Sequence, residues 1–325
     1  MALLTELGRY MQSDAPEWRA AQDLAARKNG WFTPESIQLA AQNIASFYLQ
    51  QAVLQDWIAG YQIPQNPQTV GMVMAGNIPL VGFHDFLCGF VTGHTLQIKL
   101  STKDDVLLPH LVDYMRRLDP EELARVQFVE RLQDCDAFIA TGSNNSARYF
   151  EQYFGHRPHL IRQSRTSVAV LDGDETPEAL EALSRDVYDY FGLGCRNITQ
   201  VAVPEGYDLT RLLQALNGPT HITQHHKFRN NYDYHLALFL LNKVPYQLND
   251  NLILVQNEIP FSAVATLHYR FYTDRAALIA ELKADDRIQT IVGRGEVPFG
   301  SAQTPGLCDY ADGADTMAFL CSLGA

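Results

Sequence analysis

Cys195 is the residue of this chain whose surroundings most favour covalent chemistry. It follows Gly192 and Gly194, between a helical stretch and an apolar, strand-like one. Glycines let a chain turn tightly, and the adjacent Arg196 is a cation that favours the thiolate, the form of cysteine that attacks carbonyl carbons. A cysteine is more often simply a small buried residue, but this context predicts a nucleophile.

Polar residues also follow two predicted strands. Asn77 lies in a tight turn after the strand 70–75, where its amide could donate to an oxyanion, although asparagine is a common turn residue in any case. Lys99 and Ser101 stand at the end of the strand 96–100. A lysine there could reach a ribose or phosphate, although most lysines are simply solvated.

A possible phosphate cradle is the run Thr141, Gly142 and Ser143, which opens a predicted helix. Amides at a helix N-terminus and a hydroxyl can hold a phosphate, but an ordinary capping serine explains the same pattern. Neither a GxGxxG nor a GxxxxGK[ST] motif occurs, so a nucleotide would have to use a different cradle.

Two histidines, His221 and His225, have the i, i+4 spacing that could bind a metal from one helix. No glutamate occupies the position of an HExxH motif, and no carboxylate partner is evident. We therefore expect a polar helix face here and no metal site.

The composition is that of a globular protein. The 325 residues are 46% hydrophobic and 19% charged, and the net charge of −12 disfavours nucleic acid as a partner. Five widely spaced cysteines without a CxxC pair indicate reduced thiols and a cytoplasmic location. The first residues lack the pattern of a signal peptide, and no apolar stretch is long enough to predict a membrane span.

The order of elements predicts an α/β fold. Strands alternate with helices from residue 70 onward, a pattern typical of parallel sheets, after a first sixty residues that read as helices. The expected strands are 70–75, 96–100, 126–129, 137–140, 168–171, 199–203, 252–255, 267–271 and 288–292. The expected helices are 36–57, 80–90, 104–118, 144–154, 177–191, 209–216, 221–241 and 275–283. Ligands on such sheets bind at the carboxyl ends of strands, where the candidate residues lie.

Together these motifs resemble the aldehyde dehydrogenase superfamily, and more closely its acyl-CoA reductase branch, which includes the bioluminescence-type fatty-acid reductases. The resemblance runs from about residue 71 to the C-terminus. The segment 298–313, PFGSAQTPGLCDYADG, is its most branch-specific part. It implies an aldehyde-dehydrogenase-like fold, with a Rossmann-type cofactor domain and a second α/β catalytic domain. We expect these domains at 1–190 and 191–310, with a tail, 311–325, that returns to the first.

The resemblance also implies roles for individual residues. Asn77 would donate to the oxyanion, and Lys99 with Ser101 would contact the adenosine ribose. The turn 141–143 would pack against the pyrophosphate, and Cys195 would be the nucleophile.

Two departures from the family pattern refine the expected reaction. The stretch 160–167 has no carboxylate where hydrolytic members carry a glutamate base, so an acyl-cysteine would survive to meet a hydride or a thiol. Thr102 replaces the glutamate that holds the ribose hydroxyls in members that prefer NAD, which makes NADPH plausible beside NADH. Asp104 and Asp105 nearby weaken that inference.

The sequence thus predicts reduction of an acyl-CoA or other acyl thioester to an aldehyde, with NADPH or NADH as the cofactor. Three alternatives stay open: a CoA-independent aldehyde dehydrogenase, a nucleotide-independent thiol acyltransferase or thioesterase, and a non-catalytic scaffold. The oligomeric state is also open, a homo-oligomer included.

Overall fold

The computed structural model describes residues 1–324 and divides the chain into two compact units. Unit 1 consists of Met1–Ser164 and the segment from Pro305 onward, and unit 2 is Arg165–Thr304. The chain thus leaves unit 1 about 25 residues earlier than the sequence analysis placed the first boundary. The reason is that the strand Thr166–Val170 belongs to the second sheet, and the helix Pro177–Tyr188 that follows it belongs to unit 2.

Sheet A of unit 1 has five parallel strands in the order β3-β2-β1-β4-β5. They are β1 (Thr69–Val73), β2 (Thr95–Lys99), β3 (Val126–Phe128), β4 (Ala137–Thr141) and β5 (His159–Arg162). This strand order is of the Rossmann type, as expected for the cofactor domain that the resemblance implied, although the order itself was not predicted. The sequence analysis missed β5, an edge strand in which only Arg162 is buried.

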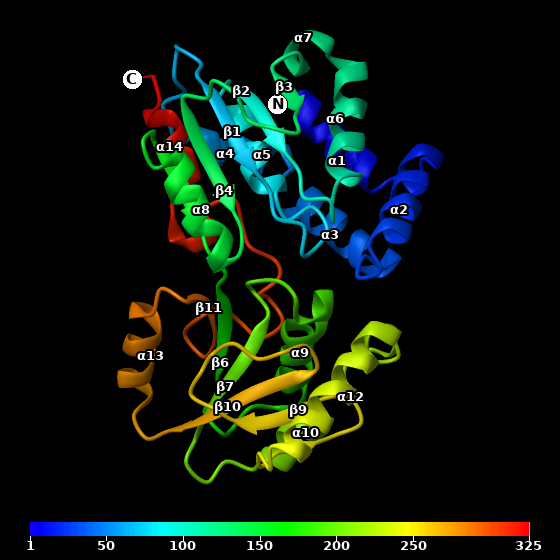
Figure 1. The fold of residues 1–325 in the computed structure, drawn as a ribbon, viewed down its shortest axis with the longest axis vertical. Coiled ribbons are helices and arrows are strands. Elements are labelled where there is room, and N and C mark those ends of the chain that lie inside the picture. Colours follow the sequence, from blue (N-terminus) through cyan, green and yellow to red (C-terminus); the bar gives the residue numbers. More distant parts are fainter. Residues whose placement is uncertain (325) are drawn as a thin grey trace. The chain divides into compact units, whose positions relative to one another are not determined.

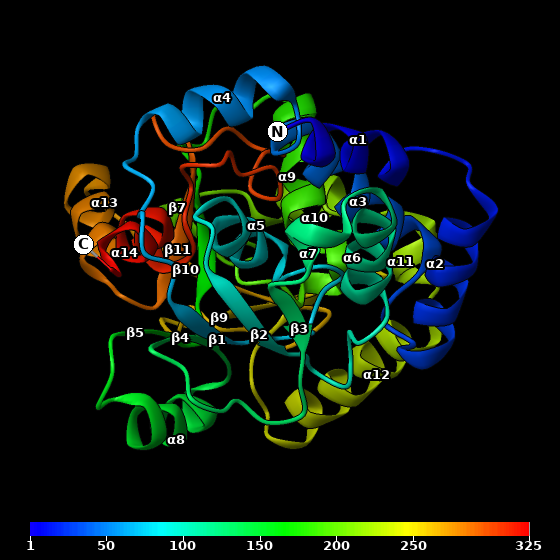
Figure 2. The same cartoon turned by 90° about the horizontal axis from the view of Figure 1, so that it is seen from above.

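Helices cover both faces of sheet A. They are α5 (Phe83–Val91), α6 (Leu107–Leu118), α7 (Pro120–Leu123), α8 (Asn144–Phe154) and α14 (Thr316–Ser322). Figure 2 shows α8 on the opposite face of the sheet from α5 and α14, and the latter two pack against each other. This three-layer arrangement buries the apolar strands on both sides.

Four N-terminal helices complete unit 1: α1 (Ala2–Met11), α2 (Pro16–Lys28), α3 (Pro34–Phe47) and α4 (Gln51–Ala59). The prediction of a single helix over 36–57 is wrong, because the helix is interrupted between α3 and α4. Leu49 is buried at the break, and the Gln50 side chain donates to the carbonyl of Ala45, 2.7 Å away. That bond satisfies one of the carbonyls that every helix end leaves without a partner.

Sheet B of unit 2 has six strands in the order β11-β6-β7-β10-β9-β8. They are β6 (Thr166–Val170), β7 (Ile198–Pro204), β8 (Gln247–Leu248), β9 (Ile253–Gln256), β10 (Thr266–Tyr272) and β11 (Ile288–Gly293). All neighbours are parallel except the short edge strand β8. The middle strands are visible as neighbouring arrows in Figure 1.

The helices of unit 2 are α9 (Pro177–Tyr188), α10 (Leu209–Ala215), α11 (Thr220–Thr223), α12 (His226–Leu241) and α13 (Arg275–Ala284). Both views place α13 on one side of sheet B and α9, α10 and α12 on the other (Figures 1 and 2). The helix predicted over 221–241 is in fact two, because the backbone of His225, at the N-cap position of α12, is extended.

Candidate functional site

The turn before Cys195 is built from left-handed residues. After α9 ends at Tyr188, a short 3₁₀ segment carries Tyr190 at φ 53°, Phe191 at φ 60° and Gly192 at φ 74°. Glycine tolerates this region, but each other residue pays about 1 to 3 kcal/mol of strain. Both aromatic side chains are buried, and this packing holds the turn. The sequence analysis assigned the turn to glycines alone and missed the two aromatic residues.

Two buried side chains hold the backbone around Cys195. The Asn197 Oδ1 accepts from Gly194 N–H at 2.8 Å, and its Nδ2 donates to the carbonyls of Asp189 at 2.7 Å and Asp186 at 3.1 Å. On the other side, Ser167 Oγ donates to the Cys195 carbonyl at 3.0 Å. Cys195 itself is partly exposed. None of the five cysteines, all of which lie within residues 1–324, forms a disulfide.

Arg196 is oriented by the neighbouring edge strand. Its Nη1 donates to Thr290 Oγ1 on β11 at 3.1 Å. Beside the same loop a small cavity of about 20 Å³ is lined by residues that include Phe191, Phe228 and Val264. That volume accommodates about one water molecule, so it is no pocket for an acyl chain.

The candidate residues of unit 1 lie at the carboxyl ends of β1, β2 and β4, which are neighbours in sheet A. The Met74 N–H donates to the Lys99 carbonyl at 3.0 Å and extends the pairing beyond β1. The next turn packs tightly, because a Cβ added to Gly76 would lie 2.8 Å from the Cβ of Ser101. The loop that carries half-buried Asn77 therefore lies against Ser101.

A buried carboxylate shapes the same loop. Asp104 is only 8% exposed, and its Oδ2 accepts from Leu80 N–H at 2.8 Å. Burial raises the pKa of Asp104 to about 7. Leu80 is left-handed, with φ 57°, so α5 begins at Phe83 and not at Leu80 as predicted. Asp104 was expected at a helix start, but α6 begins three residues later.

The polar side chains at the end of β2 and just after it differ in exposure. Lys99 and Thr102 are exposed, and Ser101 is half-buried. The Ser101 Oγ accepts from Lys103 N–H at 3.3 Å.

The run from Thr141 to Ser143 connects β4 to α8. Thr141 is the last residue of the strand, and Ser143 caps the helix, its Oγ accepting from Ser146 N–H at 3.3 Å. Gly142 allows close packing, since a Cβ there would lie 2.9 Å from Phe150 and Ser146 atoms. The capping serine was one of the two readings of this motif, and it does not conflict with anion binding by the helix N-terminus.

These residues fit a nicotinamide dinucleotide. An ammonium group, hydroxyls and the amino end of an eleven-residue helix lie at or just after the carboxyl ends of β2 and β4, the two strands that flank β1 in this Rossmann-type sheet. Donors of this kind suit a ribose and a pyrophosphate.

In the stretch 160–167, which was noted for its lack of a carboxylate base, Leu160 and Arg162 lie in β5. The Arg162 Nη1 donates to both oxygens of Asp85, and its Nη2 donates to Thr316 Oγ1 at 2.6 Å. The sequence analysis did not anticipate this buried cluster. The only hint of it in the sequence was an arginine directly after apolar residues.

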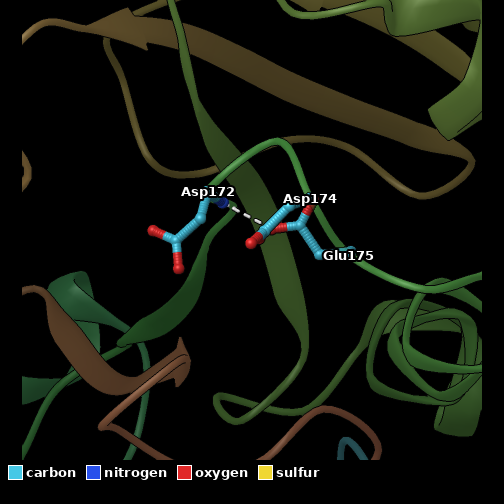
Figure 3. A group of neighbouring side chains, drawn as sticks. All are labelled: Asp172, Asp174 and Glu175. Carbon is cyan, nitrogen blue, oxygen red and sulfur yellow. Dashed lines mark hydrogen bonds between the residues drawn. The ribbon is translucent and has the colours of Figure 1, made fainter.

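The two histidines of the possible metal spacing do not share a helix, since His221 is in α11 and His225 precedes α12. A different group was missed: the carboxylates of Asp172, Asp174 and Glu175 gather within 4.8 Å after β6 (Figure 3). The closely spaced acidic residues of the run DGDE were the sequence signal for it.

Arginines of the protein itself neutralise the negative charge of this carboxylate cluster. Arg275 Nε lies 2.8 Å from Asp172, and Arg294 Nη2 lies 2.7 Å from Asp174. Glu175 accepts from the backbone N–H of Asp172, the bond drawn in Figure 3. We interpret the cluster as an anchor for the loop after β6.

Within residues 1–324, none of the helices combines the length and the apolar character needed to cross a membrane.

Neither a protein-family model nor a curated protein matches the chain, but solved structures do. An NAD-dependent aldehyde dehydrogenase from Sinorhizobium meliloti is 12% identical, with a TM-score of 0.62 over 89% of this chain and 68% of that one. An oxidoreductase from Marinobacter aquaeolei is 11% identical (TM-score 0.65; 89% and 72% covered). An NAD⁺ complex of a Bacillus cereus aldehyde dehydrogenase is 13% identical (TM-score 0.61; 89% and 70% covered). The chain therefore has the predicted aldehyde-dehydrogenase-like fold, and at these identities the likeness concerns the fold alone.

Proposed function

We propose that this protein is a nicotinamide-dependent oxidoreductase that reduces an acyl-CoA to the aldehyde through an acyl-cysteine on Cys195. The observation that carries the proposal is the partly exposed Cys195 on a strained turn whose backbone is fixed on both sides. Strained turns that the surrounding structure holds in place cluster at active sites. The likeness to aldehyde dehydrogenase structures supports the same reaction class.

In the first step, the Cys195 thiolate attacks the acyl carbon of the thioester, and the CoA thiolate leaves. The side-chain amide of Asn77 and a backbone amide near Cys195 are the proposed donors to the tetrahedral oxyanion. One such donor contributes roughly 3 to 4 kcal/mol to stabilising the transition state. Covalent capture divides one difficult reduction into two easier steps.

The cofactor would be held by Lys99, Ser101 and Thr102 at the adenosine end, and by the turn 141–143 at the pyrophosphate. A bound, reduced nicotinamide would supply hydride to the acyl carbon, and the Cys195 thiolate would leave as the aldehyde is released. The neutral Thr102 does not repel a 2′-phosphate, so we propose NADPH as the preferred form.

The absence of a carboxylate from residues 160–167 favours reduction over hydrolysis. A positioned general base typically speeds the attack of water on such an acyl carbon by about a hundredfold to ten-thousandfold. The segment instead supplies Leu160, Ile161 and an Arg162 that is already paired with Asp85. We therefore expect an acyl group on Cys195 to react with hydride or with a thiol before it is hydrolysed.

The test is to incubate the protein with a panel of acyl-CoAs and to measure the mass of the Cys195 peptide, then to add NADPH or NADH and follow absorbance. We expect an acyl adduct on Cys195, and aldehyde on addition of cofactor. Cys195→Ala should lose both while it keeps cofactor binding, measured by thermal shift. Cys308→Ala is the matched control, because it removes an exposed thiol and should behave as wild type.

Two results would refute the proposal. Aldehyde formation by Cys195→Ala would remove the nucleophile from the mechanism. Steady NAD⁺-dependent conversion of an aldehyde to the acid without CoA would instead identify a CoA-independent aldehyde dehydrogenase.

A further inference from the structure

We propose that Asn197 and Ser167 are positioning residues that aim the Cys195 sulfur at an acyl carbon. The inference rests on the proposed function only in taking Cys195 as the acyl acceptor. Both side chains are fully buried in unit 2, with 0% of their surface exposed. Each contacts the backbone on a different side of Cys195, so together they restrict the peptide that carries the sulfur.

Asn197 joins the end of α9 to the residue before the nucleophile. Its Nδ2 donates to the carbonyls of Asp186 and Asp189, and its Oδ1 accepts from Gly194 N–H. The last carbonyls of a helix have no partner within the helix, so this amide completes α9. The same amide thereby ties Gly194 to the rigid helix.

The left-handed turn explains why such a tie is needed. Tyr190 and Phe191 occupy a strained region of backbone space, which persists only where the surroundings enforce it. Asn197 bridges the turn, since its partners Asp189 and Gly194 lie on the two sides of it. Without the amide the turn could relax and carry Cys195 with it.

Ser167 acts on the other side of the nucleophile. It lies in β6, a strand with all five residues buried, and its hydroxyl donates to the Cys195 carbonyl at 3.0 Å. A buried central strand is a rigid support. Asn197 and Ser167 therefore fix the position of Cys195 relative to α9 on one side and to sheet B on the other.

Positioning predicts a difference between two kinds of reagent. Acyl transfer needs the sulfur within reach of the carbon at a defined angle, and an error of about 1 Å can cost a hundredfold in rate. Alkylation by iodoacetamide depends mainly on the exposure and ionisation of the thiol. The ratio of the two rates at Cys195 therefore reports its orientation.

The experiment uses p-nitrophenyl acetate, which acetylates a thiolate with loss of p-nitrophenolate and needs neither CoA nor nicotinamide. Acetylation and alkylation of Cys195 are followed separately by peptide mass in the full-length protein. We expect Asn197→Ala to lower the acetylation rate by about tenfold to a hundredfold, with alkylation changed by less than about threefold. Ser167→Ala should lower the acetylation rate by about threefold to tenfold. This variant removes only one hydroxyl, so it provides the test should Asn197→Ala fail to fold.

Asn249 provides the matched control. Its Nδ2 donates to the carbonyls of Leu213 and Leu216 at the end of α10, and its Oδ1 accepts from the N–H groups of Asn251 and Leu252. It performs the same type of clamp in the same unit, next to another helix. Asn249→Ala removes a comparable set of hydrogen bonds and should leave the rate ratio at Cys195 unchanged.

The inference fails if the ratio is the same in Asn197→Ala and Ser167→Ala as in wild type, or if Asn249→Ala lowers it equally. It also fails if Cys195 of the wild type is not acetylated. Failure of the proposed function looks different: acyl-CoAs are then not reduced, while acetylation of Cys195 still depends on Asn197 and Ser167.

Discussion

Arg162 Nη1 donates to both carboxylate oxygens of Asp85, at 2.7 Å and 2.6 Å, in the interior of unit 1. The arginine is 4% exposed and the aspartate 8%. A third partner, Thr316 on α14, accepts from the same guanidinium. The pair thereby joins the edge strand β5, helix α5 and the returning C-terminal segment.

Loss of one partner of this pair should be costly. Arg162→Met leaves the Asp85 carboxylate buried without its counter-charge, which costs about 3 to 5 kcal/mol in free energy of unfolding. The double variant Arg162→Met with Asp85→Leu should be more stable than Arg162→Met alone. Urea unfolding measures each value. Glu6→Gln, which breaks an exposed pair with Arg9, should cost about 1 kcal/mol or less, and an equal cost for both would contradict the assignment.

The sequence predicted much of the fold because apolar periodicity follows burial directly. The buried strands β1 and β4, for example, were expected nearly as they occur. The edge strand β5 escaped, since three of its four residues are only partly buried and the fourth is an arginine. The helix breaks at Leu49 and His225 were also not predicted, because tertiary contacts and local backbone angles determine them, whereas residue composition does not.

Prediction of the site was limited in a different way. Types and order of residues could suggest Cys195, Lys99 and Ser143, because each occupies a place next to a predicted strand or helix. The partners that hold such residues come from distant parts of the chain. Ser167 contacts the Cys195 carbonyl across 28 positions, and no local spacing reveals a pairing of that kind.

Asp104 predicts a dependence of stability on pH. Its pKa is raised from 3.8 to about 7 by burial, so the folded protein holds this proton more tightly than the unfolded chain. The resulting stability is complete below about pH 4 and is lost as the pH rises to about 7. At roughly 1.4 kcal/mol per pH unit, the loss amounts to a few kcal/mol.

Asp104→Asn should remove that contribution, so its stability should fall less than that of wild type between pH 5 and pH 8. Urea unfolding at several pH values checks this. Asp105→Asn is the matched neighbour, because Asp105 is more exposed and pairs with Lys28 at 2.7 Å. The prediction is wrong if Asp104→Asn keeps the wild-type slope.

Gly76 should not tolerate a side chain. A Cβ would lie 2.8 Å from Ser101 Cβ and 3.1 Å from the Asp104 backbone nitrogen, so Gly76→Ala must push apart the ends of β1 and β2. We expect a cost of about 1 to 3 kcal/mol, measured by thermal unfolding. At Gly60 the nearest atom is 3.4 Å away and φ is −75°, and Gly60→Ala should be nearly neutral. Similar costs at the two positions would contradict the tight packing.

Thr102 is expected to set the preference between the two nicotinamide cofactors. It is exposed after β2, close in the chain to Lys99. A carboxylate introduced by Thr102→Glu would repel a 2′-phosphate and accept from ribose hydroxyls, and at a few ångströms near a protein surface such a charge contributes about 1 to 4 kcal/mol. The ratio of the NADH to NADPH dissociation constants should therefore fall about tenfold or more, as measured by titration calorimetry. Thr102→Gln has nearly the same shape without the charge, so it separates repulsion from crowding. If both variants shift the ratio equally, or neither does, charge at this position does not select the cofactor.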